Sequence, residues 1–460
     1  MHPSRRSLLL GAVAVAAAPA AHAAGGQKIL RLQTRQIEVG GKAATRYGVT
    51  QPSGAVGLTL DEGDLFDVRV ENTLKVTSGL HWHGLNPPWQ QDGVPYISGP
   101  PIAPGQSTAY KFPFPAVPAG TRWMHSHFGL QEQDLLAAPL IVRETEAIKS
   151  GRQEVVVLLE DFSWTKPETI LERLRQPKMG GMTMSMDPAK PDLNDVDYDA
   201  YLANDRTLAD PQVVDVERNG EVRLRLINGS ASTNFTIDLG ANEGTLLTVD
   251  GNPVEPLKAS LFPLAVAQRA DILMRLPGDG RAVPILVRGE GRKLQAGVVL
   301  RPPGAAIAKI SVEGAADGPV VGLQQEILLR ATQPLAVKRV DRSVPVGLTG
   351  SMMGYTWSMP VHDMIGAPVT IARGERVELV MQNDTMMAHP MHLHGHSFQV
   401  TEINDRKLTG AIRDSVLVPP RTTVKVAFDA DNPGIWAYHC HNLYHMAAGM
   451  FTTLVYRGFT

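Results

Sequence analysis

The chain has 460 residues, and its 44 Lys and Arg against 46 Asp and Glu give a formal net charge of −2. So balanced a charge offers no electrostatic basis for binding nucleic acid or an anionic membrane. Hydrophobic residues make up 43% and charged residues 20%, as in a soluble globular protein, and this length predicts about three domains. The 43 glycines and 34 prolines favour a turn-rich all-β protein over a helical one.

The N-terminus has the pattern of an export signal. The paired Arg5 and Arg6 precede an apolar, alanine-rich run to about Ala20, and residues 21–23 (Ala-His-Ala) form a small-x-small cleavage site. The run is too short to span a bilayer as a helix. The sequence therefore predicts a twin-arginine signal peptide over residues 1–23, export by the twin-arginine machinery, a periplasmic location and no membrane insertion.

One strand-like segment occurs three times, at residues 63–72, 220–228 and 374–383, roughly 155 residues apart. Each copy starts with glycine, alternates apolar and polar residues and ends in asparagine, which is typical of a half-buried strand. A period this long indicates tandem domains, since solenoid repeats are much shorter. The predicted domains span residues 27–148, 152–304 and 322–460.

Most of the 14 histidines form pairs with one residue between the two members. The four pairs are His81 and His83, His125 and His127, His392 and His394, and His439 and His441. No histidine lies between residues 127 and 362, so the second domain supplies no imidazole and is predicted to be a spacer. A site that uses all four pairs must lie where the first and third domains meet, and ligand sites do concentrate at domain interfaces.

The only cysteine, Cys440, lies inside the last of these pairs, so no intramolecular disulfide can form. In an extended segment successive side chains alternate faces, so Cys440 would point away from His439 and His441. One tripeptide could then serve two metal sites. Cys440 with His389, His445 and Met450 makes the ligand set of a blue-copper site. The alternative, a buried thiol among incidental histidines, does not explain why the histidines sort into pairs.

Four motifs together resemble those of the multicopper oxidases, most closely the bacterial copper-tolerance oxidases and, more broadly, laccases and ascorbate oxidase. They are His-Trp-His-Gly at 81–84, His-Ser-His at 125–127, His-Pro-Met-His-Leu-His-Gly at 389–395 and the His-Cys-His…His…Met run at 439–450. The resemblance implies an all-β protein of three tandem cupredoxin-like Greek-key β-sandwich domains. It also implies four copper ions, one of type 1, one of type 2 and two of type 3.

The resemblance also assigns the ligands and the reaction. The type 2 copper would be held by His81 and His392, the type 3 pair by His83, His125, His127, His394, His439 and His441, and the type 1 copper by His389, Cys440, His445 and Met450. A reductant would give electrons one at a time to the type 1 copper. Cys440 and the peptide would carry them to His439 and His441, and four transfers would reduce dioxygen to two waters.

A proton donor is expected beside the cluster. Asp92, in the segment 90–95, matches an acidic position of related enzymes, although an Asp-Gly pair can also simply form a turn. Many bacterial relatives carry a glutamate directly after the last type 1 histidine. Here that position is Met446, which leaves the second proton donor unassigned.

The reductant is the least determined part of the prediction. Thioethers select Cu(I), and Met387, with Asp384 nearby, lies where copper-tolerance oxidases bind cuprous ion. A Gly-rich stretch adds Met179, Met182, Met184 and Met186. These methionines could instead fill gaps in the core or on the surface. A further group, Met352, Met353, Met359 and Met364, leaves both interpretations open.

We expect a copper-dependent oxidase of Cu(I), and also of phenols, that protects the periplasm against copper. A zinc hydrolase would use nearby carboxylates and would not need the Cys-His-Met set. The alternative that remains is a non-catalytic periplasmic copper-binding or storage protein, which oxygen uptake would distinguish.

Overall fold

The computed structural model describes residues 26–113, 115–176 and 192–459. The predicted signal peptide and the methionines at 179, 182, 184 and 186 lie outside the described residues. The described chain is built almost entirely of strands, with three short helices, and this confirms the predicted all-β class. None of the helices in these ranges is long and apolar enough to cross a membrane.

The first sandwich consists of two four-stranded sheets. Its strands are β1 (Lys28–Val39), β2 (Lys42–Thr50), β3 (Leu58–Asp61), β4 (Phe66–Asn72), β5 (His81–His83), β6 (Ser107–Phe112), β7 (Gly120–His125) and β8 (Ala137–Arg143), with the 3-10 helix η1 (Trp89–Gln91) after β5. One sheet has the order β2-β1-β4-β6 and the other β3-β8-β7-β5. Phe66 and Phe112 stack at 4.5 Å between ring centroids, and Trp82 meets Phe66 edge-on across the core.

The second sandwich follows the short helix α1 (Thr145–Ser150). Its elements are β9 (Gln153–Phe162), α2 (Pro167–Arg175), β10 (Ala200–Ala203), β11 (Gln212–Asp215), β12 (Glu221–Asn228), β13 (Phe235–Asp238), β14 (Gly244–Val249), β15 (Asn252–Ala259), β16 (Leu261–Leu264), β17 (Arg269–Arg275), β18 (Val283–Gly289) and β19 (Gln295–Arg301). A six-stranded sheet, β10-β9-β12-β17-β14-β15, packs against a five-stranded sheet, β11-β19-β18-β13-β16.

Residues 302–341 cross from the second sandwich to the third and include the 3-10 helix η2 (Glu326–Leu328). The third sandwich contains β20 (Arg342–Ser351), β21 (Thr356–Ser358), β22 (Val369–Ile371), β23 (Arg376–Asn383), β24 (His389–Leu393), β25 (Phe398–Ile403), β26 (Arg406–Lys407), β27 (Ile412–Arg413), β28 (Ser415–Val418), β29 (Thr423–Asp429), β30 (Ile435–Cys440), α3 (Leu443–Ala447) and β31 (Phe451–Tyr456). One sheet follows β21-β20-β23-β29-β25-β26, with β27 beside β25, and the other follows β22-β31-β30-β24-β28.

The three sequence repeats are equivalent strands. They form β4, β12 and β23, and each pairs in parallel with the first long strand of its sandwich, β1, β9 or β20. Each ends in a buried asparagine whose side-chain amide donates to two backbone carbonyls: Asn72 to Val76 and Ile102, Asn228 to Thr233 and Leu264, and Asn383 to Met387 and Val418. The same polar anchor therefore fixes the loop after this strand in every sandwich.

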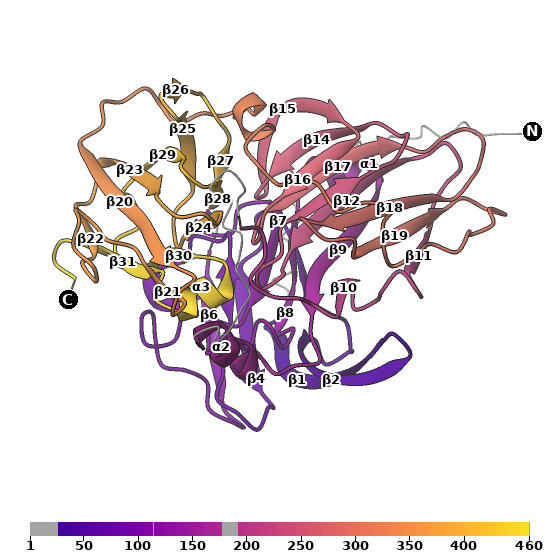
Figure 1. Cartoon of the computed structure of the whole chain (residues 1–460), viewed down its shortest axis with the longest axis horizontal. Helices are drawn as coiled ribbons and strands as arrows, with labels where there is room; N and C mark the ends of the chain where they lie inside the picture. Colours follow the sequence, from indigo (N-terminus) through magenta and orange to yellow (C-terminus); the bar gives the residue numbers. More distant parts are fainter. Residues whose placement is uncertain (1–25, 114, 177–191, 460) are drawn as a thin grey trace, which may run out of the picture.

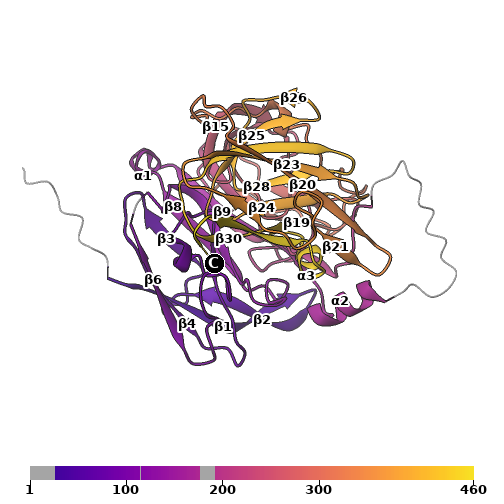
Figure 2. The same ribbon diagram turned by 90° about the vertical axis from the view of Figure 1, so that its left-hand side faces the viewer.

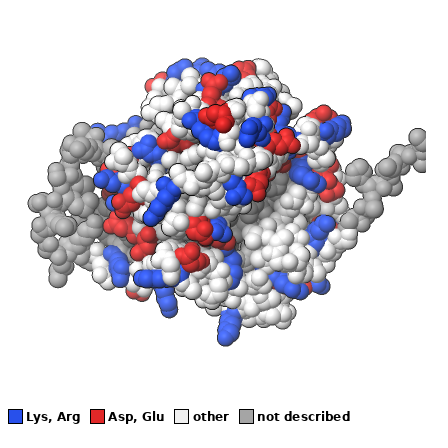
Figure 3. All heavy atoms as spheres, turned by 90° about the vertical axis from the view of Figure 1, so that its right-hand side faces the viewer, with Lys and Arg blue, Asp and Glu red and all other residues white. Residues whose placement is uncertain are grey.

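The sandwiches meet around a common centre. In Figure 1 the third sandwich, in orange and yellow, lies beside the second, in pink, and the first, in indigo and purple, lies below both. Figure 2 shows α2 at the edge of the molecule, near α3 of the third sandwich. On the face in Figure 3, acidic and basic side chains are interspersed, in keeping with the nearly neutral net charge.

Candidate metal centre

Paired antiparallel strands in two sandwiches carry the histidine pairs. In the first sandwich β5 pairs with β7, and His81 is opposite His125. In the third sandwich β24 pairs with β30, and His392 is opposite His439. The two arrangements are pseudo-symmetric, so each sandwich presents two histidine pairs at one end of its sheet.

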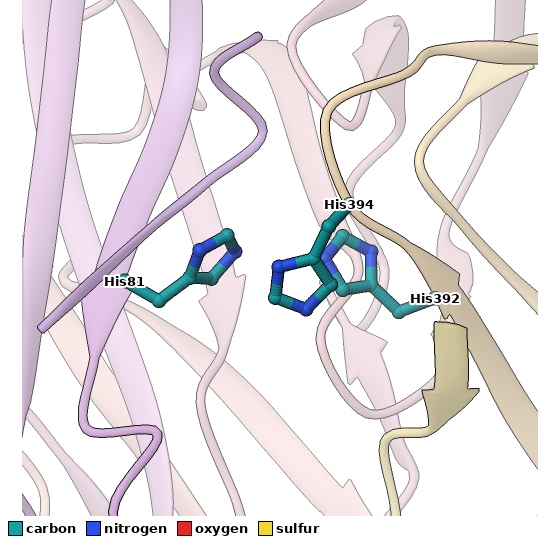
Figure 4. Close-up of side chains that lie close together, drawn as sticks. All are labelled: His81, His392 and His394. Carbon is teal, nitrogen blue, oxygen red and sulfur yellow. The ribbon is translucent and has the colours of Figure 1, made fainter. Parts of the chain in front are cut away.

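These eight histidines meet between the first and third sandwiches. His127 Nε2 lies 3.2 Å from His439 Nε2, and His394 Nε2 lies 3.0 Å from the same atom. The ring centroids of His81 and His394 are 4.0 Å apart. Figure 4 shows His81 approaching from the first sandwich toward His392 and His394 of the third. The cluster thus spans the domain interface, where the sequence predicted it.

Several ring nitrogens in this cluster are left without hydrogen-bond partners among the described residues. The buried Nε2 atoms of His81, His392 and His441 have none. Ligand atoms of His81, His392 and His394 lie within 4.8 Å of one another, as do those of His127, His394 and His439. A buried polar atom without a partner is costly, and imidazole is a good ligand for copper. The residues therefore fit a multinuclear copper site.

The protonation state of the cluster suits metal binding. Burial, followed by the neighbouring imidazoles, holds the pKa of His83 and His394 well below the usual range. Burial likewise lowers the pKa of His439 to about 4. These rings are neutral near pH 7, and a neutral imidazole has a free lone pair for a metal ion.

Cys440 belongs to a second, smaller centre on the other side of β30. Its Sγ lies 3.8 Å from His389 Nδ1 and 3.7 Å from His445 Nδ1. Helix α3 orients His445, because the Asn442 side chain accepts hydrogen bonds from the backbone N–H groups of Tyr444 and His445. Burial raises the pKa of the Cys440 thiol, so formation of the thiolate requires a bound cation.

Met450 is held beside this centre by the backbone. Its N–H donates to the carbonyl of His445, and its carbonyl accepts from Cys440 N–H. The Met450 side chain is fully buried. Cys440, His389 and His445 thus converge on one side of β30, with the buried Met450 tied to Cys440 and His445 through the backbone, while His439 and His441 belong to the larger cluster on the other side. This donor set fits a blue-copper ion.

Asp92 lies between the histidines of the two domains. Nδ1 of His394 donates to Asp92 Oδ2 at 2.8 Å, and His81 Nδ1 lies 3.2 Å from Oδ1 and 2.9 Å from the Asp92 carbonyl. Asp92 also caps η1, so it ends that turn as well. Its carboxylate is buried and contacts one histidine from each domain.

Glu132 is a second carboxylate at the cluster, and it was not among the predicted site residues. Its Oε2 lies 2.8 Å from His125 Nδ1, and its Oε1 lies 3.7 Å from His441 Nδ1. Burial raises the pKa of Glu132 well above its usual range, so the group can hold a proton beside the histidines. Glu132 and Met446 line the same small space against the cluster. Because Glu132 belongs to no motif, only the fold reveals this position.

Asp195 and Thr385 hold the histidines of the cysteine centre. Asp195 Oδ2 lies 2.8 Å from His445 Nε2 and accepts a hydrogen bond from the Tyr355 hydroxyl. Thr385 Oγ1 lies 2.8 Å from His389 Nε2. Such partners fix ring orientation and raise ligand basicity, and neither residue was singled out in the sequence.

Asp384, which we expect to be a ligand for substrate copper together with Met387, lies outside the cysteine centre. Asp384 is exposed, and its Oδ1 accepts from the Gln382 side chain. Side chains alternate at the end of β23, so Asp384 points outward while Thr385 turns inward, where its hydroxyl also donates to the buried Asn383. Met387 is buried, close to His389 along the chain.

The second domain is more than a spacer. Its Arg269 donates to Oδ1 of Asp414, which lies 3.0 Å from His83 Nε2. The Asp414 carbonyl accepts from Nδ1 of His392. All of these groups are buried, and removing one partner of a buried ion pair costs about 3–5 kcal/mol. The second domain thus contributes no imidazole, as expected, but it supplies Arg269 to one centre and Asp195 to the other.

Comparisons with known proteins agree with this geometry. Three multicopper oxidase family models match residues 32–147, 153–298 and 340–458. The chain is 30% identical to multicopper oxidase MmcO of Mycobacterium tuberculosis, across 96% of this chain and 90% of that protein. It is 27% identical to copper resistance protein A of Escherichia coli, across 85% of this chain and 86% of that protein.

Solved structures show the same fold. The crystal structure of Fet3p, a multicopper oxidase that functions in iron import, superposes with a TM-score of 0.77 at 19% identity, covering 93% of this chain and 90% of that one. At this identity the likeness establishes the cupredoxin-like fold alone. The three family models and the 30% identity to MmcO show that this chain belongs to the multicopper oxidase family, the copper-dependent oxidoreductases that use dioxygen as electron acceptor.

Proposed function

We propose that this protein is a periplasmic cuprous oxidase, which couples the one-electron oxidation of Cu(I), and of phenols, to the four-electron reduction of dioxygen to water. The observation that carries the proposal is that eight histidines meet in one cluster and His389, Cys440 and His445 in another, and that the tripeptide 439–441 contributes to both. The twin-arginine pattern at the N-terminus supports export to the periplasm. We also propose the domain extents 27–148, 152–304 and 322–460.

We assign the ligands as follows. His389, Cys440, His445 and Met450 would hold a type 1 copper, His81 and His392 a type 2 copper, and His83, His125, His127, His394, His439 and His441 a type 3 pair. The unpartnered Nε2 atoms of His81, His392 and His441 leave three lone pairs free for copper, which supports metal binding by this cluster. Bound copper would supply the one-electron and dioxygen chemistry, while the protein supplies geometry and protons.

The chain's own residues connect the two centres. The tripeptide of His439, Cys440 and His441 gives an electron a path of a few covalent bonds from the thiolate to the cluster. The pairing of β24 with β30 keeps this path rigid, with Met391 opposite Cys440 and His392 opposite His439. Asp92, in contact with His394 and His81, is proposed to pass protons to the reacting oxygen.

Two methionines support Cu(I) as the reductant. Met386 and Met387 line a cavity of about 540 Å³ between the second and third domains, close to His389 in the chain. Arg421 donates to the sulfur of Met386. Soft thioethers beside the cysteine centre suit a cuprous ion. The same cavity is of the size that a small organic molecule occupies, which supports phenols as further reductants.

The substrate proposal is tested by turnover of Cu(I) and of a phenol. Met387→Leu keeps the shape but removes a soft ligand, so KM for Cu(I) should rise about tenfold while phenol turnover stays unchanged. A second variant, with Met179, Met182, Met184 and Met186 all changed to Leu, tests the Gly-rich stretch in the same assay. Met274→Leu, a change in the buried core of the second domain, is the matched control. Equal Cu(I) kinetics in all four proteins would refute the methionine argument.

A further inference from the structure

Three buried acidic residues contact the histidine cluster in one common pattern. Each of them meets one histidine of the first domain and one of the third. Asp92 does so for His81 and His394, Asp414 for His83 and His392, and Glu132 for His125 and His441. Six of the eight histidines thus form three pairs, and one acidic residue joins each pair across the domain interface.

Glu132 contacts the same ring nitrogen of both its histidines. Its Oε2 lies 2.8 Å from His125 Nδ1, and its Oε1 lies 3.7 Å from His441 Nδ1. This Oε1 is buried and has no hydrogen-bond partner among the described residues. On the other edge of each ring, His125 Nε2 lies 3.4 Å from His83 Nδ1, and His441 Nε2 is buried without a partner. An imidazole that donates from Nδ1 to a carboxyl group keeps the lone pair of Nε2 free for a metal.

The two neighbouring glutamines fix the position of Glu132 in the chain. Gln133 donates to the carbonyl of Asp161 and accepts from the hydroxyls of Tyr198 and Tyr444. These partners belong to the second domain and, in the case of Tyr444, to helix α3 of the third domain. On the other side, Gln131 forms hydrogen bonds within the first domain to Thr77, Ser78 and Ser126. Contacts with all three domains therefore determine where the Glu132 carboxyl group lies.

We propose that Glu132 is a positioning residue for the copper cluster: it holds His125 and His441 with their Nε2 atoms free for metal, and so joins ligands of the first and third domains. The proposal rests on the proposed function, which counts both histidines among the copper ligands. The role requires no particular charge, because a protonated carboxyl group still accepts through its carbonyl oxygen. Loss of such a partner of a ligand histidine lowers metal affinity by roughly 10- to 100-fold.

Two substitutions of Glu132 separate positioning from proton transfer. Glu132→Gln keeps one acceptor oxygen in a side chain of the same shape but cannot donate and regain a proton as an acid does. Glu132→Leu removes both acceptors and leaves two buried imidazoles without this partner. The matched control is Glu290→Gln. Glu290 is a buried glutamate of the second domain, and its oxygens accept from the Asn234 side chain and the Val321 N–H rather than from a histidine.

The experiment titrates each copper-loaded protein with a chelator of known copper affinity. Total copper content reports on both centres, and the blue absorption reports on the cysteine centre alone. In Glu132→Leu the affinity of the cluster for copper should fall by roughly 10- to 100-fold. In Glu132→Gln it should lie between that value and wild type, because one amide oxygen can serve only one of the two rings. Glu290→Gln should match wild type, and the blue centre should be retained equally in all four proteins.

The orientation of the rings gives a second measurement that does not depend on copper. Crystals of the copper-free proteins should show His125 or His441 turned away from its wild-type orientation in Glu132→Leu, and both rings unchanged in Glu290→Gln. If Glu132→Leu does not fold, Glu132→Gln still tests the inference, since its copper affinity must then be lower than that of wild type.

The outcomes separate this inference from the oxidase function. Wild-type copper affinity in both Glu132 variants would overturn the positioning role, and slow dioxygen reduction at that full affinity would make Glu132 a proton donor instead. Wild-type ring orientations in copper-free Glu132→Leu would also contradict the inference. A wild type that loses cluster copper on substitution of Glu132 as expected, but does not consume dioxygen, would refute the oxidase function and leave the role of Glu132 intact.

Discussion

Replacing Cys440 with serine should remove the blue colour of the copper-loaded protein and reduce dioxygen consumption on the order of a thousandfold, about 4 kcal/mol in the barrier. The colour arises from charge transfer between a thiolate and Cu(II), and Cys440 is the only cysteine in the chain. Serine cannot replace the thiolate as a ligand or as the electron path to His439 and His441. Absorption and copper content, measured on the same sample, check the prediction.

The matched control is Ser126→Ala. Ser126 occupies the position equivalent to Cys440 in the first domain, between two histidines of the cluster. Its hydroxyl donates to Gln131 and contacts neither His389 nor His445 in the structure. The control should therefore remain blue. In Cys440→Ser the histidine cluster should keep most of its copper. An oxidised wild type that is fully loaded with copper yet colourless would contradict the type 1 assignment.

Replacing Asp92 with asparagine should leave the blue colour intact and slow dioxygen reduction about a hundredfold, the usual size of a lost proton-transfer group. The amide oxygen can still accept the hydrogen bond from His394 Nδ1, so the geometry should survive. An amide cannot carry the proton, however. The measurement is rapid mixing of the reduced variant with dioxygen.

Anaerobic reduction of the variant separates the proton role from a structural one. The cysteine centre lies across β30 from Asp92, so its reduction should be as fast as in wild type. Loss of that step as well would indicate a distorted fold. Turnover at the wild-type rate would mean that Asp92 only ends the η1 turn.

The histidine motifs predicted more of the site than any other feature of the sequence. Histidine spacing identified the groups that β5, β7, β24 and β30 bring together, because a strand displays residues i and i+2 on one face. The repeated strands at 63–72, 220–228 and 374–383 likewise predicted three β domains, and β4, β12 and β23 are equivalent in the fold.

The groups around the ligands could not be predicted in this way. Glu132, Asp195 and Arg269 reach the two centres through contacts between separate parts of the chain, and no local pattern marks them. The role of Asp384 toward substrate copper stays a prediction. Proximity in sequence to His389 suggested a role, but at the end of a strand a shift of one residue reverses the side chain, and Thr385 takes the inner position.

The most direct test of the oxidase assignment is the number of electrons consumed per dioxygen. A known amount of a one-electron reductant is added to the copper-loaded protein, and dioxygen uptake and hydrogen peroxide are measured together. We expect four electrons per dioxygen and no peroxide, because the eight histidines form a single cluster on which the whole reduction can proceed. Two electrons per dioxygen with accumulating peroxide would contradict the oxidase assignment. No dioxygen uptake by a fully loaded protein would also contradict it, and would indicate a copper-binding protein without turnover.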